Sequence, residues 1–273
     1  MPKPPLGPAT SLCMSLAARP GQFGSRFHNR LYELLGLDFV YKAFTTTDLP
    51  AAIGGVRALG VRGCAISMPF KEAVIALLDG LDPSAAVIES VNTIVNDDGR
   101  LTGFNTDYIA IAQLLARAAI RPETPFVLRG AGGMAKAVAA ALYHRGHENG
   151  LVVARDEAKG RALAGRYGFG WAPTPQGLEA ALLINATPLG MKGADEAALA
   201  FPAATIARAE TVFDVVALPV ETPLLRAAAA AGKTCISGAD VAIIQALEQF
   251  VLYTGTRPAA EMVAQAAAFA RAG

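Results

Sequence analysis

The sequence has few of the residues that build metal centres and disulfide frameworks. It contains three cysteines and three histidines in 273 residues, and neither type occurs at a spacing typical of a metal site or a redox pair. Cys13, Cys64 and Cys235 each lie inside an apolar, strand-like run. We therefore expect buried thiols in a reducing compartment, which favours a cytoplasmic protein, and we expect no bound metal.

An excess of one charge and long apolar runs are also lacking. The formal net charge is +1, and there is no basic block with interleaved aromatic residues, so no nucleic-acid partner is expected. Glycine, proline and charged residues interrupt every alanine-rich stretch before it reaches the roughly 18 apolar residues of a membrane span. The 53% apolar content fits a globular chain that binds small molecules. No pattern indicates an oligomeric state.

Strand-like and helix-like apolar spacings alternate along the chain, which indicates the α/β class. In the first hundred residues the expected strands are Ser11–Ala17, Phe39–Thr46, Val61–Met68 and Ser90–Asn96, and the expected helices are Ser25–Leu35, Leu49–Leu59 and Phe70–Leu78. The turn signal Asp97-Asp98-Gly99 predicts a hairpin at a sheet edge, with Arg100–Phe104 as its second strand.

A second alternating pattern follows Pro122. The predicted strand Phe126–Arg129 runs into the turn Gly130-Ala131-Gly132-Gly133 and the helix Met134–His144, the order of half of a doubly wound nucleotide-binding fold. The other expected strands are Leu151–Ala154, Leu182–Ala186, Val212–Val216 and Thr234–Ser237, and the other expected helices are Tyr108–Ala119, Glu157–Tyr167, Pro223–Ala231, Val241–Tyr253 and Pro258–Ala270.

The glycine-rich turn has the chemistry of a dinucleotide site. A turn without Cβ atoms lets the backbone approach a pyrophosphate, and the helix that follows presents free N–H groups to it. At the end of the next strand, where an acidic residue would bind the ribose of NAD, the sequence has Arg155, with Lys159 one turn later. This pattern favours NADP. Asp156 between the two cations keeps NAD possible, and the alternative is a solvated loop with an Asp156–Lys159 salt bridge.

Four further segments contain polar residues whose presence the formation of a strand or loop does not explain. They are Ser67-Met68-Pro69-Phe70-Lys71-Glu72, Ser90-Val91-Asn92-Thr93, Asn105-Thr106-Asp107, and Asn185-Ala186-Thr187-Pro188-Leu189-Gly190-Met191. In this order around the glycine-rich turn, they resemble the shikimate dehydrogenase family over essentially the whole chain. The strings S-M-P-F-K, E-S-V-N-T and F-D-V-V-A-x-P-V-E-T-P resemble its shikimate dehydrogenase-like branch.

The resemblance implies a fold and an activity. Residues 1–106 and 239–273 would form a mixed α/β substrate domain, residues 107–238 a doubly wound (Rossmann) NADP domain, and the C-terminal helices would return to the first domain. The implied activity is that of an NADP-dependent oxidoreductase resembling shikimate 3-dehydrogenase, an enzyme of shikimate metabolism and aromatic amino acid biosynthesis. It would transfer a hydride reversibly between NADP(H) and shikimate or 3-dehydroshikimate.

The resemblance also implies roles for individual residues. Lys71 and Asp107 would be the catalytic pair, and Ser67, Asn92 and Gln245 would bind substrate. The implied cofactor residues are Gly130, Ala131, Gly132, Gly133, Met134, Ala135, Arg155, Lys159, Thr187 and Gly238. A lysine amine held in a dry cleft can accept a hydroxyl proton, and a nearby carboxylate would favour its protonated form. Which of the pair is the formal base stays open. The alternative is an exposed lysine and an aspartate that caps a helix.

The chain departs from the family where the substrate carboxylate is held. Gln22 and Gly24 stand at the places of two serines, and Ala65 and Ala217 replace an asparagine and a tyrosine. Gln22 can restore one donor and is the expected substrate-binding residue of this loop, and Arg26 can supply a positive charge, so a carboxylate is not excluded. Each missing hydrogen bond would weaken binding by roughly tenfold to a hundredfold, so weak activity on shikimate is expected. The alternatives are the same redox chemistry on quinate, aminoshikimate or another small hydroxy acid, and a cofactor-binding sensor with negligible turnover.

Overall fold

The computed structural model describes residues 2–272, which fall into two compact units. Within the described residues, the first unit comprises residues 2–106 and 243–272, and the second comprises Asp107–Ala242. Each unit is built on a six-stranded sheet with helices packed on it. The α/β class predicted from the alternating pattern is confirmed.

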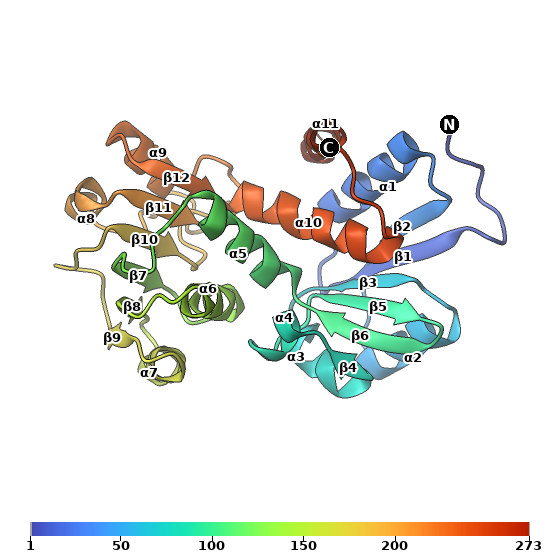
Figure 1. Cartoon of the computed structure of the whole chain (residues 1–273), viewed down its shortest axis with the longest axis horizontal. Helices are drawn as coiled ribbons and strands as arrows, with labels where there is room; N and C mark the ends of the chain where they lie inside the picture. The colour runs from blue at the N-terminus through green and yellow to red at the C-terminus, as the bar shows by residue number, and fades with distance from the viewer. Residues whose placement is uncertain (1, 273) are drawn as a thin grey trace. The chain divides into compact units, whose positions relative to one another are not determined.

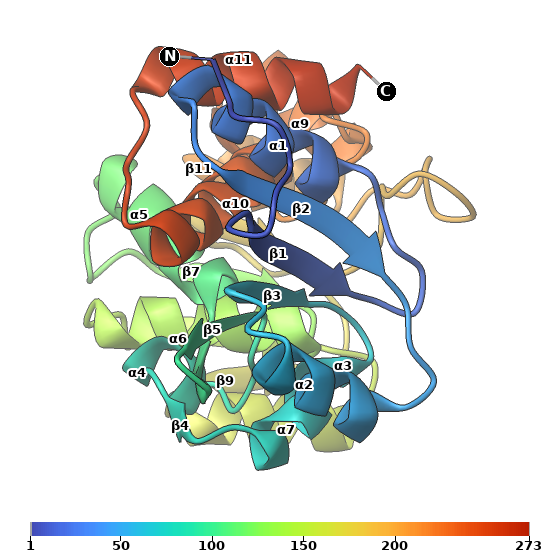
Figure 2. The same cartoon turned by 90° about the vertical axis from the view of Figure 1, so that its right-hand side faces the viewer.

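The sheet of the first unit is mixed. Its order is β2 (Phe39–Phe44), β1 (Ser11–Leu16), β3 (Gly63–Ile66), β5 (Thr93–Asp97), β6 (Arg100–Phe104) and β4 (Gly80–Leu81), and Figure 2 shows the first four strands in this succession. Strands β5 and β6 form the predicted hairpin. Its predicted place at the sheet edge is wrong, because β4 pairs with β6 and covers that edge. A strand of two residues leaves no alternating pattern to detect.

The helices of the first unit lie on both sides of its sheet. They are α1 (Phe23–Leu35), α2 (Leu49–Ala58), α3 (Phe70–Ala73), α4 (Pro83–Ala86), the part of α10 (Gly238–Thr254) that follows Ala242, and α11 (Ala260–Arg271). The segment Phe70–Leu78 is helical as predicted as far as Leu77, but it is not one α-helix, because the α-turn Phe70–Ala73 is followed by the 3-10 turn Val74–Leu77. The predicted return of the C-terminal helices to the first unit is confirmed, because α11 packs beside α1 (Figure 2). At this contact the Arg26 guanidinium donates to the Phe269 carbonyl at 2.8 Å.

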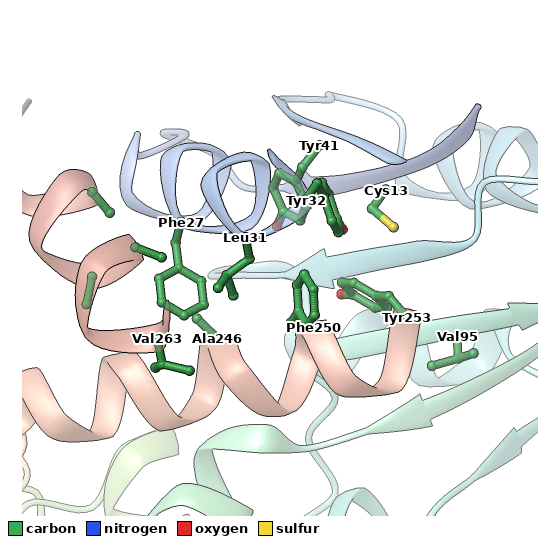
Figure 3. Close-up of a cluster of buried hydrophobic side chains, with 13 residues drawn as sticks. Cys13, Phe27, Leu31, Tyr32, Tyr41, Val95, Ala246, Phe250, Tyr253 and Val263 are labelled. Atoms are coloured by element: carbon green, nitrogen blue, oxygen red, sulfur yellow. The ribbon is translucent and has the colours of Figure 1, made fainter. Parts of the chain in front are cut away.

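The core between α1, α10 and α11 contains polar aromatic side chains as well as apolar ones. Figure 3 shows Phe27 and Leu31 of α1 facing Phe250 and Tyr253 of α10, with Tyr32 and Tyr41 beside them. His28 is fully buried there and stacks on Tyr41 with ring centroids 4.4 Å apart. Burial lowers the pKa of His28 to about 4, so the ring is neutral near pH 7. This core fixes α1 and α10 against one face of the sheet.

The sheet of the second unit is entirely parallel. Figure 1 shows its strands side by side, from β12 (Thr234–Ser237) through β11 (Thr211–Asp214), β10 (Leu182–Asn185), β7 (Phe126–Arg129) and β8 (Gly150–Val153) to β9 (Gly170–Ala172). The central strands β10 and β11 are buried along their whole length, with apolar residues at 182–184 and 212–213, as expected where helices cover both faces. Cys235 is exposed on the edge strand β12, so the prediction of a buried thiol is wrong for this cysteine.

The helices of the second unit complete a doubly wound topology, which confirms that prediction. They are α5 (Thr106–Arg117), α6 (Gly133–His144), α7 (Glu157–Arg166), α8 (Ala203–Arg208) and α9 (Pro223–Ala230). The chain moves outward from β7 to β9 and then restarts at β10 on the other side of β7. Such a reversal leaves a crevice at the carboxyl ends of the strands. No helix within residues 2–272 is long and apolar enough to cross a membrane.

Candidate active site

The glycine-rich turn lies where the strand order of the second unit reverses. Gly130 has a φ of 125°, and a Cβ there would lie 2.7 Å from the Ala186 carbonyl oxygen, so only glycine fits the turn. At Gly132 and Gly133 a Cβ would meet nothing within 4 Å. Gly132 is also the N-cap of α6 and offers no side chain to its first N–H groups. The turn therefore leaves an open helix N-terminus that suits a phosphate.

A cleft of about 730 Å³ opens beside this turn. The carboxyl ends of β7, β8 and β10 form its floor, and its lining includes the predicted cofactor residues Gly130, Ala131, Gly132, Arg155, Lys159 and Thr187. Gly133, Met134 and Ala135 continue into α6 and do not line it. Gly238 is also outside it and begins α10, where a Cβ would overlap the Val215 carbonyl oxygen. The cleft has the size and position of a nucleotide site.

Three positive side chains line the cleft. Arg155 and Lys159 are exposed at the end of β8 and in the first turn of α7. Asp156 is the N-cap of α7, where its Oδ1 accepts the Lys159 backbone N–H at 3.0 Å, and this bond lowers its pKa. The Asp156 carboxylate also lies 3.5 Å from Lys159 Nζ. Arg129 is the third cation, and the sequence reading missed it, although a guanidinium directly before a glycine-rich turn is an unusual end for a core strand.

Thr187 is held by a buried network at the floor of the cleft. Its N–H and hydroxyl donate to Asn185 Oδ1 at 3.1 and 2.6 Å, and Asn185 Nδ2 donates to Asp214 Oδ1 at 2.9 Å. Asp214 is fully buried and also accepts from the Thr222 hydroxyl at 2.6 Å and from the Val216 N–H at 3.1 Å. Burial raises the pKa of Asp214, and these hydrogen bonds oppose the rise. The carboxylate therefore ties the 185–191 loop to the 214–223 loop.

Asp214→Asn should lower the free energy of unfolding by about 1–3 kcal/mol. Both carboxylate oxygens of Asp214 accept hydrogen bonds, and an amide nitrogen in place of one of them would leave a buried donor without its acceptor. Urea titration measures the loss. Asp98→Asn, in the exposed turn between β5 and β6, is the matched control and should change little. Equal stability of the two variants would contradict the structural role assigned to Asp214.

Ser67, Lys71 and Asn92 are brought together in the first unit by two backbone hydrogen bonds. The Ile66 N–H donates to the Asn92 carbonyl, and the Val91 N–H donates to the Lys71 carbonyl, each at 2.8 Å. Ser67 is exposed just after β3, Lys71 is half-buried in α3, and Asn92 is 2% exposed just before β5. The two segments that the sequence marked as separate motifs therefore form one site.

The Asn92 amide is held in one orientation. Its Oδ1 accepts from the Thr106 N–H and the Thr93 hydroxyl, both at 2.8 Å, and from the Thr106 hydroxyl at 3.2 Å. Gln249 Nε2 donates to Thr93 Oγ1 at 3.0 Å, which leaves the Thr93 hydroxyl hydrogen for Asn92. Asn92 Nδ2 is buried, and none of residues 2–272 supplies it with an acceptor. Asn92 therefore offers a buried, unsatisfied N–H₂ group, and the residue before it, Val91, is hydrogen-bonded to the Lys71 carbonyl.

Gln249 is a residue that the sequence reading missed. It is 3% exposed on α10 and also donates to the Asn92 carbonyl at 3.3 Å. The predicted residue Gln245 precedes it by one helical turn and is half-buried, so the two share a face of α10. That i, i+4 spacing was the available signal.

Asp107 and Gln22 complete the set of predicted residues. Asp107 is 7% exposed in the first turn of α5, directly after Thr106, where the helix dipole favours a carboxylate. Gln22 is exposed as the N-cap of α1 and makes no side-chain capping bond. No group of three His, Cys, Asp or Glu side chains in the described part of the chain could hold a metal ion. The catalytic and binding roles of all these residues stay predictions.

Comparison with known sequences identifies similar proteins along the whole chain. Residues 23–94 match the family model described as the shikimate dehydrogenase substrate binding domain. A shikimate dehydrogenase-like protein of Haemophilus influenzae is 54% identical over 263 residues, which cover 96% of this chain and 97% of that protein.

Solved structures show the same architecture. A shikimate 5-dehydrogenase-like protein, 53% identical, superposes with a TM-score of 0.95 over 97% of this chain and 99% of its own. A Thermus thermophilus shikimate 5-dehydrogenase in complex with NADP(H) and shikimate gives 0.85 at 34% identity, over 95% of this chain and 99% of its own. A Corynebacterium glutamicum quinate dehydrogenase in complex with NAD gives 0.85 at 29% identity, over 97% and 99%.

Proposed function

Because the chain belongs to the shikimate dehydrogenase family, we propose that it oxidises and reduces a small hydroxy acid with NADP(H), with shikimate as the first candidate. The observation that carries this proposal is the buried, unsatisfied Asn92 Nδ2, in a segment whose backbone is hydrogen-bonded to that of Lys71. An unsatisfied buried donor costs about 1–3 kcal/mol, and a substrate hydroxyl supplies the acceptor. Gln245 and Ser67 contribute further polar contacts to the same substrate.

The cofactor site is proposed in the second unit. Backbone N–H groups from Gly130 to Ala135 at the start of α6 bind the pyrophosphate, Arg155 and Lys159 bind the 2′-phosphate, and Thr187 and Gly238 lie along the rest of the dinucleotide. The open space at Gly132 and Gly133 and the cations of the cleft support this fit. When bound, the nicotinamide supplies the hydride acceptor. Asp156 near Lys159 weakens the charge available to the 2′-phosphate, so use of NAD is also proposed.

Proton transfer is proposed for Lys71 and Asp107. Oxidation of a secondary alcohol requires a group that takes the hydroxyl proton as the hydride leaves. We assign this proton transfer to Lys71 and Asp107 as the catalytic pair, with either residue as the formal base.

A second candidate is the same chemistry on another hydroxy acid, such as quinate or aminoshikimate. The loop after β1 favours it, because Gln22 is exposed and Gly24 has no side chain where the family holds a carboxylate with serines. The Arg26 guanidinium does not replace the missing serines, because it lies 4.4 Å from the Phe269 ring centroid and donates to the Phe269 carbonyl. Weak turnover of shikimate is therefore proposed.

The purified full chain should reduce NADP in the presence of shikimate, quinate or another hydroxy acid of a small panel, followed by absorbance of the reduced nicotinamide. Turnover with NADP on shikimate supports the first candidate, and turnover only on another acid supports the second. Binding of NADP without turnover on any acid would contradict both and favour a cofactor-binding sensor.

The Gln22→Ser, Gly24→Ser double variant should lower the KM for shikimate by roughly tenfold to a hundredfold through restored hydrogen bonds to the carboxylate. Serine fits at position 24, because a Cβ there would lie 3.5 Å from Tyr41 Oη, an ordinary contact. Steady-state kinetics measure the change. The methyl ester of shikimate is the control substrate and should gain nothing, whereas an equal gain for acid and ester would show that these positions do not hold the carboxylate.

A further inference from the structure

Arg129 occupies a place that the cofactor assignment leaves unused. It is the last residue of β7, immediately before the glycine-rich turn, and it lines the same cleft as Arg155 and Lys159. In the parallel pairing of β7 with β8, Arg129 lies opposite Val153, two residues before Arg155. Neighbouring strands are about 4.8 Å apart, so the two guanidinium groups start from adjacent strand ends.

The protein itself satisfies only part of the Arg129 guanidinium. Its Nη1 donates to the Ala200 carbonyl, which orients the side chain. Within residues 2–272 neither Arg129 nor Arg155 forms an ion pair with a carboxylate. A guanidinium has five N–H donors in a plane, so most of the Arg129 donors are left for a ligand.

The two arginines oppose each other electrostatically. Burial lowers the pKa of Arg129, and the positive charge of Arg155 lowers it further. Placing two such charges together is unfavourable unless an anion lies between them. Lys159 does not take that role alone, because Asp156 lies 3.5 Å from its ammonium group. Asp195 also lines the cleft, but within residues 2–272 it forms no ion pair with either arginine. The positive charge that no ion pair compensates is therefore carried by Arg129 and Arg155.

We propose that Arg129 is a specificity-determining residue that binds the 2′-phosphate of the adenosine ribose together with Arg155. This inference rests on the proposed NADP site. Two guanidinium groups can each give paired hydrogen bonds to a phosphate dianion, whereas the uncharged 2′-hydroxyl of NAD offers them no anion. The positive charge of Arg129 then offsets the repulsion between Asp156 and the 2′-phosphate, so the cleft binds NADP more tightly than NAD.

The test compares adenosine 2′,5′-bisphosphate with adenosine 5′-monophosphate, which differ only in the 2′-phosphate, by isothermal titration calorimetry on the full chain. The variant is Arg129→Gln, since glutamine keeps a polar amide at this position but carries no charge. Bisphosphate affinity should fall about tenfold and monophosphate affinity should change by less than about twofold. Arg129→Lys keeps the charge and should recover part of the loss.

A double-mutant cycle with Arg155→Gln sharpens the test. Two residues that bind one phosphate should be energetically coupled, so the fold-loss in bisphosphate affinity of the double variant should differ from the product of the two single fold-losses. It should be smaller if both arginines are needed together, and larger if either arginine alone can hold the phosphate. Strict multiplicativity, an equal loss for both nucleotides, or no loss with Arg129→Gln would overturn the proposal and leave Arg129 as a brace for the Ala200 carbonyl. No wild-type preference for the bisphosphate would overturn it too. Absence of turnover on hydroxy acids with an intact bisphosphate preference would instead refute only the proposed dehydrogenation.

Discussion

Lys71→Ala should lower kcat on the best substrate by about 10³-fold, because general acid or base catalysis contributes roughly 10²–10⁴ to the rate. NADP affinity should not change, since Lys71 is not among the residues that line the nucleotide cleft. The fold should survive, because the Lys71 carbonyl that accepts from the Val91 N–H is retained in alanine. Steady-state kinetics and a fluorescence titration of NADPH measure the two quantities.

The control variant for this prediction is Lys42→Ala. Lys42 is exposed on β2 in the same unit and carries the same charge, so its loss should leave kcat nearly unchanged. A small primary amine added to Lys71→Ala should restore part of the activity if the missing group handles a proton. If Lys71 had no catalytic role, Lys71→Ala and Lys42→Ala would both be fully active. A kcat of Lys71→Ala above about a tenth of the wild-type value would refute the catalytic assignment.

The second unit could be predicted well from the sequence for physical reasons. Buried parallel strands are continuous apolar runs, and the glycine turn of residues 130–133 separates one such strand from a helix. Short elements without such patterns were missed: β9 has three residues and α8 has six. In the first unit, the segment Phe70–Leu78 has helical spacing, but the chain tightens there into a 3-10 turn, which has nearly the same periodicity.

The candidate site could be predicted only as separate motifs. Asn92 was found by its string, but the orientation of its amide depends on Gln249, which lies 157 residues later in the chain. Arg129 was missed for the same reason, because its significance depends on Arg155 across a strand pairing and on the Ala200 carbonyl 71 residues away. Local sequence patterns predict strands, helices and turns. The hydrogen-bond partners of a buried polar group depend on tertiary contacts, so these patterns do not predict them.

Gly132→Asp should change stability and cofactor affinity in opposite directions. Gly132 is the N-cap of α6 with an extended backbone, φ −85° and ψ −171°, and its Cβ position is open, so aspartate fits without strain. Aspartate is a better N-cap than glycine by a few tenths of a kcal/mol, and its charge suits the helix dipole. Urea titration should therefore show equal or slightly higher stability.

The same carboxylate should weaken NADP binding by about a hundredfold or more, because it occupies the N-terminus of α6 that the pyrophosphate needs and repels it. Fluorescence titration with NADPH measures the loss. Gly132→Asn is the isosteric control, which caps the helix without the charge and should lose much less affinity. If aspartate and asparagine weakened binding equally, the pyrophosphate would not lie at the start of α6. If aspartate left binding intact, the cleft beside Gly132 would not be the cofactor site.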